Sequence, residues 1–451
     1  MSDINFEEQF HKSALDSAKR KKDAQNPVKI ARDIIDEQVM IYYGDSFFRY
    51  EVGRYTILNE NQMKQLIHQH LKYDYRQAKF KEISDCMMAQ CLVNDLNPNH
   101  GVNILNGILN LETMELKPHS KDQHFTTQLK AIYDPEAKSP KWDAFLNEML
   151  MDDPAKILVL QEYSGYALDY GVNVEMIIFL LGRGANGKSV FCDAIKTVIG
   201  YGNYASISLD DLKNKNYVAE LLGKLVNIST ESQAKAEIYE SNLKKLASGE
   251  EITVDRKFKN PFSFKSNCKH IYCLNNLPRV GDRTDAFFRR ILPIPFNMQV
   301  ERHKRILRLG QLIGEEEPSG ILNWMLDGYK RLRSNSWQFT QSQQVNELLD
   351  EYRKDNNNVL NFVDECCHFG TERSQDYHFM SNEDSYIRYQ RWCKESGCNS
   401  FKKKNFVDEI IHNFKHQKVI RDKVNGKRGL LRISLLPEEP SFSPESSGRY
   451  S

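Results

Sequence analysis

The chain has 451 residues, with 62 Lys and Arg against 61 Asp and Glu, so its formal net charge is only +1. Hydrophobic residues make up 40% and charged residues 27%, which is ordinary for a soluble globular protein of about three domains. The longest apolar runs are far too short to span a bilayer, and the N-terminus lacks the apolar core of a signal peptide. We therefore expect a cytoplasmic protein with no membrane partner.

The nine cysteines do not have the spacing of a disulfide framework, so reduced thiols are expected. Cys366, Cys367 and His368, with Cys393 and Cys398, offer zinc-binding atoms but lack the C-x-x-C spacing of zinc ribbons and fingers. Buried or incidental cysteines are the favoured interpretation over a zinc site.

Residues 1–140 mix helical and strand patterns and predict an N-terminal α/β domain. Residues 60–71 have a helical pattern, and residues 102–111 predict a strand followed by a turn. A turn signal at residues 133–135 marks a plausible domain boundary. Helices are then expected over residues 142–170.

From residue 174 to residue 298, short apolar strands alternate with helices, which predicts a parallel α/β core. Residues 182–189, GRGANGKS, fit the phosphate-binding loop pattern G-x-x-x-x-G-K-[ST]. An apolar run at 176–181 predicts a buried strand before the loop, and residues 190–195 predict a helix after it. A simple glycine-rich turn is the alternative.

This pattern predicts a site for ATP and Mg²⁺. The glycines let backbone N–H groups encircle phosphate oxygens, Lys188 reaches the β- and γ-phosphates, and the Ser189 hydroxyl can ligate Mg²⁺. The expected nucleotide-binding residues are Gly182, Gly184, Ala185, Asn186, Gly187, Lys188, Ser189 and Val190.

Such a loop needs an acidic partner on a neighbouring strand to help hold Mg²⁺ and to polarise the attacking water. Glu231 is the preferred candidate because it follows the apolar strand 225–229, at the strand end where α/β sheets place ligand groups. The rival segment 209–212 lacks a preceding apolar strand and predicts a turn or a helix start.

Two further strand ends carry candidate catalytic groups. Asn275 ends the apolar strand that begins at His270 and can orient water or sense the γ-phosphate, although such asparagines are usually in turns. Arg289 and Arg290 precede another apolar strand and can stabilise a transferring phosphoryl group, often in a neighbouring subunit. The alternative for the arginines is a surface ion pair.

Residues 252–264 predict a hairpin with a basic and aromatic tip. Such a tip suits phosphate contact and base stacking on single-stranded nucleic acid, and a solvated charged turn is the alternative. The candidate DNA-binding residues of this tip are Arg256, Lys257, Phe258 and Lys259.

An amphipathic helix is expected over residues 320–332, with Ser319 as its N-cap. A polar linker, 334–344, leads to a C-terminal module, 345–436, and the Pro-, Ser- and Glu-rich segment 437–451 is predicted to be disordered.

The C-terminal module has the pattern of a winged helix-turn-helix. Helices are expected over 383–394 and 401–414, the second capped by Ser400, and strands 419–424 and 430–435 flank an Asn-Gly turn. A basic helix N-terminus and a basic wing suit duplex DNA, and a solvated charged face is the alternative. The residues expected to contact DNA are Lys402, Lys403, Lys404, Lys427 and Arg428.

In this order, the motifs resemble those of superfamily 3 helicases, the AAA+ motors of small viruses, phages and mobile elements. The resemblance covers about residues 100–400 and is strongest to the phage and plasmid primase-helicase branch, which is similar to the poxvirus primase-helicase. Within that branch the chain looks most like the replication initiators of staphylococcal pathogenicity islands. The matching phrases are residues 110–113 (NLET) with 116–119 (LKPH), 184–189 (GANGKS), 275–278 (NNLP), 288–290 (FRR) and 319–324 (SGILNW).

The resemblance implies roles by position. Lys188 and Ser189 match the phosphate and metal positions, Glu231 the catalytic acid and Asn275 the sensor amide. Arg290 falls on the arginine-finger position with Arg289 as its helper. The family often has two adjacent acids where this chain has Thr230 before Glu231.

The hairpin at 255–259 is similar to the DNA-tracking hairpin of papillomavirus helicases, with Phe258 in place of a histidine. The first hundred residues are too short for a primase domain and lack a paired-aspartate motif, so primer synthesis is not expected. The implied domains are 1–140 (N-terminal), 141–344 (AAA+ helicase), 345–436 (winged helix) and 437–451 (tail).

These features predict an ATP-dependent replicative DNA helicase and origin-binding initiator of a mobile element. The resemblance implies a homo-hexameric ring that moves on single-stranded DNA, usually 3′ to 5′. Expected partners are single-stranded and duplex origin DNA and replication proteins of the host or the element. A DNA-binding ATPase regulator without unwinding activity is one alternative, and an RNA helicase or packaging motor is another.

Overall fold

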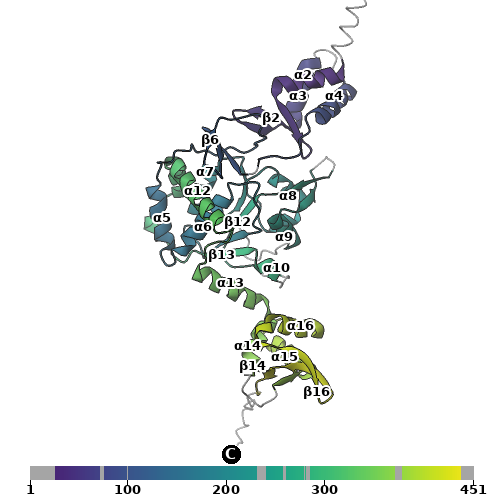
Figure 1. Ribbon diagram of the computed structural model, residues 1–451, viewed down its shortest axis with the longest axis vertical. Helices are drawn as coiled ribbons and strands as arrows, with labels where there is room; N and C mark the ends of the chain where they lie inside the picture. The colour runs from purple at the N-terminus through teal and green to yellow at the C-terminus, as the bar shows by residue number, and fades with distance from the viewer. Residues whose placement is uncertain are drawn as a thin grey trace, which may run out of the picture. The chain divides into compact units, whose positions relative to one another are not determined.

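The computed structural model describes residues 26–71, 76–98, 100–230, 240–256, 261–278, 280, 285–370 and 378–437 (Figure 1). The chain divides into two compact units, the first ending at Leu349 and the second beginning at Asp350. The described residues do not include four predicted site residues or the expected disordered tail beyond Pro437. The four are Glu231, Lys257, Phe258 and Lys259.

A five-stranded parallel sheet lies at the centre of the first unit. Its strand order is β13-β7-β12-β9-β8, and every neighbouring pair is parallel. The strands are buried along almost their whole length because both faces of a parallel sheet are covered. This confirms the predicted α/β core with a parallel sheet. The strands are β7 (Ile177–Leu181), β8 (Tyr204–Ala205), β9 (Val226–Ser229), β12 (Lys269–Leu274) and β13 (Ile291–Pro295).

Two pairs of helices pack closely beside this sheet. Helix α12 lies against α6, where Gly165 and Gly328 allow the backbones to approach, and α11 lies against α7, where Gly310 meets Val190. A methyl group on any of these glycines would clash with a carbonyl of the facing helix. The helices of this layer are α5 (Pro140–Leu150), α6 (Ala155–Tyr166), α7 (Lys188–Ile199), α11 (Leu309–Glu316) and α12 (Pro318–Ser334).

The start of α12 differs from the expectation. Helix α12 begins at Pro318, so Ser319 lies inside the first turn, and Glu317 occupies the N-cap position. The Glu317 carboxylate accepts hydrogen bonds from the backbone N–H groups of Lys141 and Trp142 at the start of α5. The prediction of Ser319 as the cap was therefore wrong, because Pro, which suits the first helical turn, precedes it.

The N-terminal part of the first unit has two sections. Its beginning has a core of its own, in which Ile34, Met63 and Ile67 are buried. The later part, around Val102 and Leu109, packs into the same core as Trp142. Helix α3 spans the predicted residues 60–71. The elements are α2 (Pro27–Gln38), β1 (Met40–Tyr43), β2 (Ser46–Glu51), β3 (Arg54–Ile57), α3 (Glu60–Leu71), α4 (Gln77–Gln90), β4 (Gly101–Ile104), β5 (Gly107–Asn110) and β6 (Leu116–Lys117).

Short elements connect the strands of the sheet. Strands β10 and β11 form the expected antiparallel hairpin, and the rival acidic segment near residue 210 is a 3₁₀ turn. These elements are η1 (Asp210–Lys213), α8 (Lys215–Val218), η2 (Ala219–Leu221), α9 (Glu240–Ser248), β10 (Glu251–Val254), β11 (Phe262–Lys265), α10 (Asp285–Phe288) and η3 (Arg302–Lys304).

The second unit packs three helices against antiparallel strands, with Phe362, Tyr389, Phe406 and Leu430 in its core. Strands β16 and β17 pair around the predicted Asn-Gly turn. Its elements are α13 (Gln343–Asn356), which crosses the boundary between the units, α14 (Asn358–Cys366), β14 (Cys367–Phe369), β15 (Phe379–Ser381), α15 (Asn382–Glu395), α16 (Lys403–Asn413), η4 (Lys415–Gln417), β16 (Ile420–Val424), β17 (Lys427–Leu431) and β18 (Ile433–Leu435).

Helix α16 begins later than predicted. Lys402 is its N-cap residue and its side chain makes no capping bond, so the assignment of Ser400 as the cap was wrong. The preceding segment is held in an extended path, because the Phe401 N–H donates to the Tyr389 hydroxyl and the Asn399 carbonyl accepts from Asn358.

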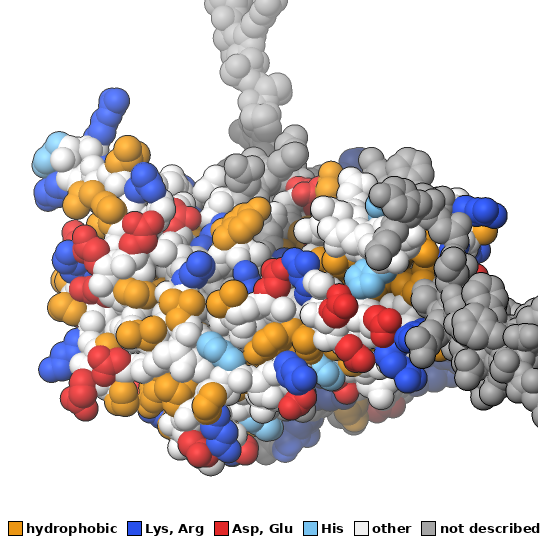
Figure 2. Space-filling model, turned by 90° about the horizontal axis from the view of Figure 1, so that it is seen from above, with side chains coloured by type: hydrophobic (Ala, Val, Ile, Leu, Met, Phe, Trp, Pro, Cys, Tyr) orange, Lys and Arg blue, Asp and Glu red, His pale blue; other side chains and the backbone are white. Residues whose placement is uncertain are grey.

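The described residues show mixed surface charge, free cysteines and no cluster of metal ligands. On the face drawn in Figure 2, cationic and anionic side chains are interspersed, in keeping with the near-zero net charge. The nine cysteines are free thiols. Within the described ranges, no three His, Cys, Asp or Glu side chains gather as a metal site, and no helix has the length and apolar character to cross a bilayer.

Candidate nucleotide-binding site

The loop at 182–189 joins β7 to α7 and adopts a tight path that glycine makes possible. Gly182 has φ +155° and Gly187 has φ +86°, both in the region that favours glycine. A Cβ on Gly182 would lie 1.7 Å from Asn186 Nδ2, and one on Gly187 would lie 2.9 Å from Met149 Cγ. The loop therefore passes closely over its own Asn186 side chain and against Met149 of α5, and α7 begins at Lys188.

Lys188 lies at the centre of this loop and is 6% exposed. Its Nζ donates to the Gly182 carbonyl at 2.6 Å and to Asn186 Oδ1 at 2.9 Å. Asn186 in turn donates to the Phe296 carbonyl at 3.1 Å, which ties the loop to the end of β13. Burial lowers the pKa of Lys188, so an anionic ligand beside it would stabilise its charged form.

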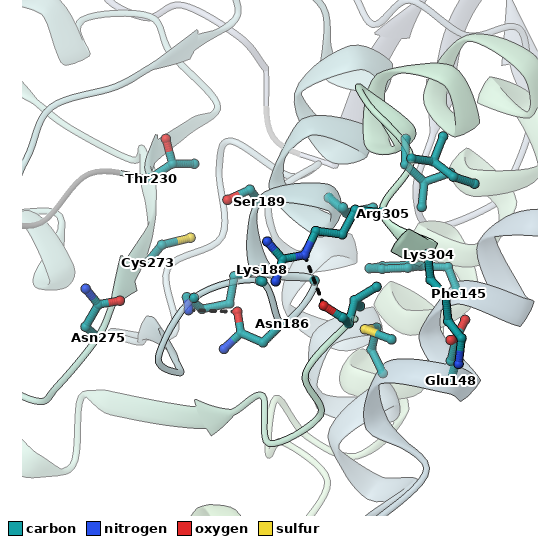
Figure 3. A pocket seen from close by; sticks show the side chains of 18 residues that line it. Phe145, Glu148, Asn186, Lys188, Ser189, Thr230, Cys273, Asn275, Lys304 and Arg305 are labelled. Atoms are coloured by element: carbon teal, nitrogen blue, oxygen red, sulfur yellow. Dashed lines mark hydrogen bonds between the residues drawn. The ribbon is translucent and has the colours of Figure 1, made fainter. Parts of the chain in front are cut away.

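A cavity of about 540 Å³ opens on this loop (Figure 3). One side is polar and includes Lys188 and Ser189. The other side combines the apolar side chains of Phe145, Met149 and Leu309 with the charged Glu148 and Lys304 (Figure 3). A cavity that joins a cationic, amide-rich loop to apolar side chains has the chemistry that phosphates and a flat ring require.

The carboxyl ends of two other strands reach the same cavity. Asn275 follows β12 and Thr230 follows β9, and both line the cavity with Ser189 (Figure 3). Because β12 lies between β7 and β9, these ends meet at one edge of the sheet. The structure thus brings Asn275 to the phosphate-binding loop, while Glu231 lies just beyond Thr230 and outside the described residues.

Cys273 also lines the cavity, and its Sγ lies 3.4 Å from the Sγ of Cys192 on α7. Cys192 is one helical turn after Lys188, so the thiol pair lies beneath the loop. The hydrogen bond between the two thiols lowers the pKa of Cys273.

Sequence reasoning missed the rest of the wall. Phe145, Glu148 and Met149 come from α5, and Lys304, Arg305 and Ile306 come from the segment between β13 and α11. These residues lie far from the loop in the chain, and no motif or periodicity marks them, so only the packing of α5 and α11 on the loop reveals them.

The two adjacent arginines have different surroundings, and neither lines the cavity. Arg290 is 11% exposed and donates to Glu175 at 2.6 Å, to Ser248 at 3.0 Å and to the Ala286 carbonyl. Arg289 is 62% exposed and lies 3.9 Å from Glu175. Arg290 is thus bound within its own chain, and Arg289 is the exposed member of the pair.

Arg256 lies at the base of the β10–β11 hairpin. Its Nη1 donates to the Ser46 hydroxyl at 2.6 Å, and its guanidinium lies 4.8 Å from the centre of the Phe262 ring. This predicted DNA contact is therefore engaged with β2 and β11 of its own chain.

The predicted DNA-binding residues of the second unit lie on its surface. Lys402 and Lys404 are exposed at the start of α16, and Lys403 pairs with Glu383. Lys427 and Arg428 are exposed beside the β16–β17 turn, with Lys427 3.5 Å from Asp384. Both groups of cations can therefore reach an external anion.

Three segments of the chain match models of protein families. Residues 11–151 match the model described as D5 N terminal like, residues 180–290 match a family of unknown function, DUF5906, and residues 354–431 match the model described as Poxvirus D5 protein-like.

One curated relative and one solved structure extend these matches. The chain is 29% identical over 142 residues to "Putative helicase L207/L206" of Acanthamoeba polyphaga mimivirus, an alignment that covers 30% of this chain and 15% of that relative's length. The apo structure of the NrS-1 C-terminal region shares its fold, with a TM-score of 0.53, 13% identity, and coverage of 91% of this chain and 99% of that one. The two D5-like matches and the viral relative together support a relationship between this chain and the viral primase-helicase proteins.

Proposed function

We propose that the chain is an ATP-dependent replicative DNA helicase of superfamily 3 and an origin-binding initiator of a mobile genetic element, similar to the initiators of staphylococcal pathogenicity islands. The observation that carries the proposal is the cavity in which Lys188 and Ser189 of the phosphate-binding loop meet Asn275 from the adjacent strand. A loop of this kind joined to a polar group on the neighbouring strand is the arrangement that nucleotide hydrolysis needs.

ATP fits the chemistry of the cavity. Its volume of about 540 Å³ lies within the range of small-molecule sites, its polar side carries a buried cation, and its apolar side chains suit a purine. Mg²⁺ would be held by the Ser189 hydroxyl, with Glu231 as the proposed second ligand, and it would neutralise charge on the phosphates.

Each protein group has a role in this scheme. Lys188 binds the β- and γ-phosphates, Asn275 orients the attacking water, and Glu231 accepts its proton. Of the two adjacent arginines, we assign the contact with a neighbouring subunit's nucleotide to Arg289, because it is 62% exposed. Arg290, held by Glu175 and Ser248, positions the turn that carries Arg289.

The DNA contacts come from two places. The β10–β11 hairpin, with Lys257, Phe258 and Lys259 at its tip, moves one DNA strand through a hexameric ring in the 3′ to 5′ direction. The second unit acts as a winged helix that binds duplex origin DNA through Lys402, Lys403, Lys404, Lys427 and Arg428. Replication proteins of the host or the element would load the ring.

The test measures strand displacement on a forked DNA duplex. ATP hydrolysis and duplex binding are measured in parallel assays. The wild-type protein should hydrolyse ATP faster with single-stranded DNA and should displace a strand. Lys188→Ala should lose both activities, by at least about 100-fold, because the phosphate-binding cation is gone. Duplex binding should persist.

Lys196→Ala is the matched control, since Lys196 lies on the same helix but faces Tyr204 rather than the cavity. Hydrolysis without displacement would favour a DNA-binding ATPase regulator. Stimulation by RNA alone would favour an RNA motor. Particles imaged with an ATP analogue and forked DNA should show a six-fold ring around one strand.

A further inference from the structure

The segment between β13 and α11, residues 296–308, crosses the phosphate-binding loop and is anchored to it by backbone contacts. We call this segment the strap. The Phe296 N–H donates to the Leu181 carbonyl at 2.8 Å, and the Val300 N–H donates to the Ala185 carbonyl at 2.8 Å. Beyond the strap, Gly310 packs directly on the Val190 backbone at the start of α7. The strap therefore follows the loop from the end of β7 to the first turn of α7.

The strap contributes a cation to the cavity. Arg305 lines the cavity with Lys188 and Ser189, and in Figure 3 its side chain extends toward them. Its Nε donates to the Val300 carbonyl at 3.0 Å, which orients the guanidinium. Among the described residues, Arg305 has no ion pair, and its Nη1 and Nη2 make no hydrogen bond. A guanidinium fixed through Nε with both terminal nitrogens available can bind a phosphate through two parallel hydrogen bonds.

The next residue of the strap has an apolar side chain at the same cavity. Ile306 is 59% exposed and lines the cavity together with Phe145 and Met149 of α5. Leu307, the following residue, is 86% exposed but does not line the cavity. An apolar side chain beside other apolar side chains, in the cavity that the phosphate-binding loop lines, is suited to cover a nucleobase.

We propose that the strap completes the nucleotide site in cis, with Arg305 binding the phosphate chain of a nucleoside triphosphate and Ile306 covering its base. The proposal rests on the proposed nucleotide hydrolysis. It adds two residues to the site, and it assigns the phosphate-binding arginine of the strap to the same chain as Lys188.

Equilibrium binding tests the roles of the two residues. The probe is a fluorescent ATP analogue with Mg²⁺, displaced by unlabelled ATP or by inorganic tripolyphosphate. Arg305→Ala should weaken both competitors about tenfold or more, because it removes charged hydrogen bonds to phosphate. Arg305→Lys should recover part of the affinity, since it keeps the charge but loses the planar fork.

Ile306→Ser should weaken ATP several-fold and leave tripolyphosphate unchanged. The matched controls are Arg308→Ala, whose guanidinium bonds to Gln311 outside the cavity, and Leu307→Ser. Both controls should bind as the wild type does. Wild-type affinity in Arg305→Ala, or an equal loss in Arg308→Ala, would overturn the assignment of Arg305. Equal effects of Ile306→Ser and Leu307→Ser would overturn the assignment of Ile306.

A mixing experiment tests the cis assignment. When Arg305→Ala and Lys188→Ala chains are assembled together, every site lacks one of the two cations if both come from the same chain, so nucleotide binding should not recover. Recovery would show that Arg305 serves a neighbouring chain and would overturn the cis assignment. A failure of the proposed helicase function would look different. In that case the wild-type protein would bind ATP through Arg305 but would displace no strand. Absence of nucleotide binding by the wild type would overturn both proposals.

Discussion

The Arg290 guanidinium donates a 2.6 Å hydrogen bond to the Glu175 carboxylate, although 115 residues separate the two in the chain. Glu175 lies just before β7 and Arg290 just before β13, and these two strands are hydrogen-bonded neighbours in the sheet. The ion pair therefore links the N-terminal ends of two adjacent strands, β7 and β13. We expect an arginine held in this way to stabilise its own subunit, whereas the adjacent Arg289 is exposed.

Arg289→Ala and Arg290→Ala should therefore affect different properties of the protein. Arg290→Ala should lower the free energy of unfolding by about 1–3 kcal/mol, since it removes charged hydrogen bonds at a largely buried position. Arg289→Ala should leave unfolding unchanged and lower ATP hydrolysis in the assembled protein. Chemical denaturation and ATPase assays measure the two quantities.

Mixing gives a sharper check on Arg289. Because Arg289 is proposed to act on a neighbour's nucleotide, Arg289→Ala chains mixed with Lys188→Ala chains should regain part of the ATPase activity. No recovery in that mixture would contradict the assignment of Arg289 to a neighbouring site.

Lys269 predicts a specific pH dependence of stability. Its ammonium group is buried beneath Tyr166 and donates to the carbonyls of Asp169, Val172 and Asn267. Burial lowers its pKa from 10.5 to about 7. Between these two values the unfolded chain binds the proton more readily than the folded chain, so this group makes stability rise with pH through that window.

Lys269→Met removes this titration along with the hydrogen bonds. The difference in unfolding free energy between the wild type and Lys269→Met should therefore be larger at pH 9 than at pH 7. Denaturation of both proteins at the two pH values measures it. A difference that stays constant between the two pH values would show that Lys269 keeps its ordinary pKa in the folded chain, and one that shrinks with pH would also contradict the lowered pKa.

The turn between β16 and β17 predicts a change in DNA affinity that is separate from ATP hydrolysis. Changing Lys427 and Arg428 together to Ala should weaken duplex binding and reduce the slope of log affinity against log salt by about two, one for each lost phosphate contact. The ATPase activity without DNA should not change, because neither residue lines the nucleotide cavity.

The control for this variant is the pair Lys354→Ala and Lys394→Ala, two other exposed lysines of the second unit. This pair should retain most of the affinity and the salt slope. An equal loss in both double variants would indicate a diffuse electrostatic attraction instead of a contact made by the turn.

Gly328 predicts a packing effect that owes nothing to charge. A Cβ at this position would lie 2.1 Å from the Gln161 carbonyl oxygen of α6. Gly328→Ala should therefore push α12 away from α6 and lower the unfolding free energy by roughly 1–3 kcal/mol, despite the higher helix propensity of alanine. Thermal or chemical denaturation measures the loss. Gly397→Ala is a weaker substitution for comparison, since a Cβ there meets no atom within 4 Å and only its positive φ disfavours alanine.

The amino-acid sequence by itself determined the features that depend on neighbouring residues. The phosphate-binding loop, the strands beside it, helix α3 and the β16–β17 turn all follow from glycine positions and from the 2- and 3.6-residue periods of apolar side chains. Asn275 could be placed in the site because parallel strands end at a common edge of the sheet. These are local rules, and the surrounding structure did not override them.

Only the tertiary structure decided the features that depend on distant segments. Two expected caps, Ser319 and Ser400, were wrong because Pro318 starts one helix early and contacts of Phe401 delay the other. The apolar wall of the cavity and the cation Arg305 come from α5 and the strap, which reach the loop only when the chain folds. Likewise, the packing of β7 beside β13 binds Arg290 to Glu175 and leaves Arg289 exposed. The sequence cannot distinguish the two positions, because both are arginines and they are adjacent.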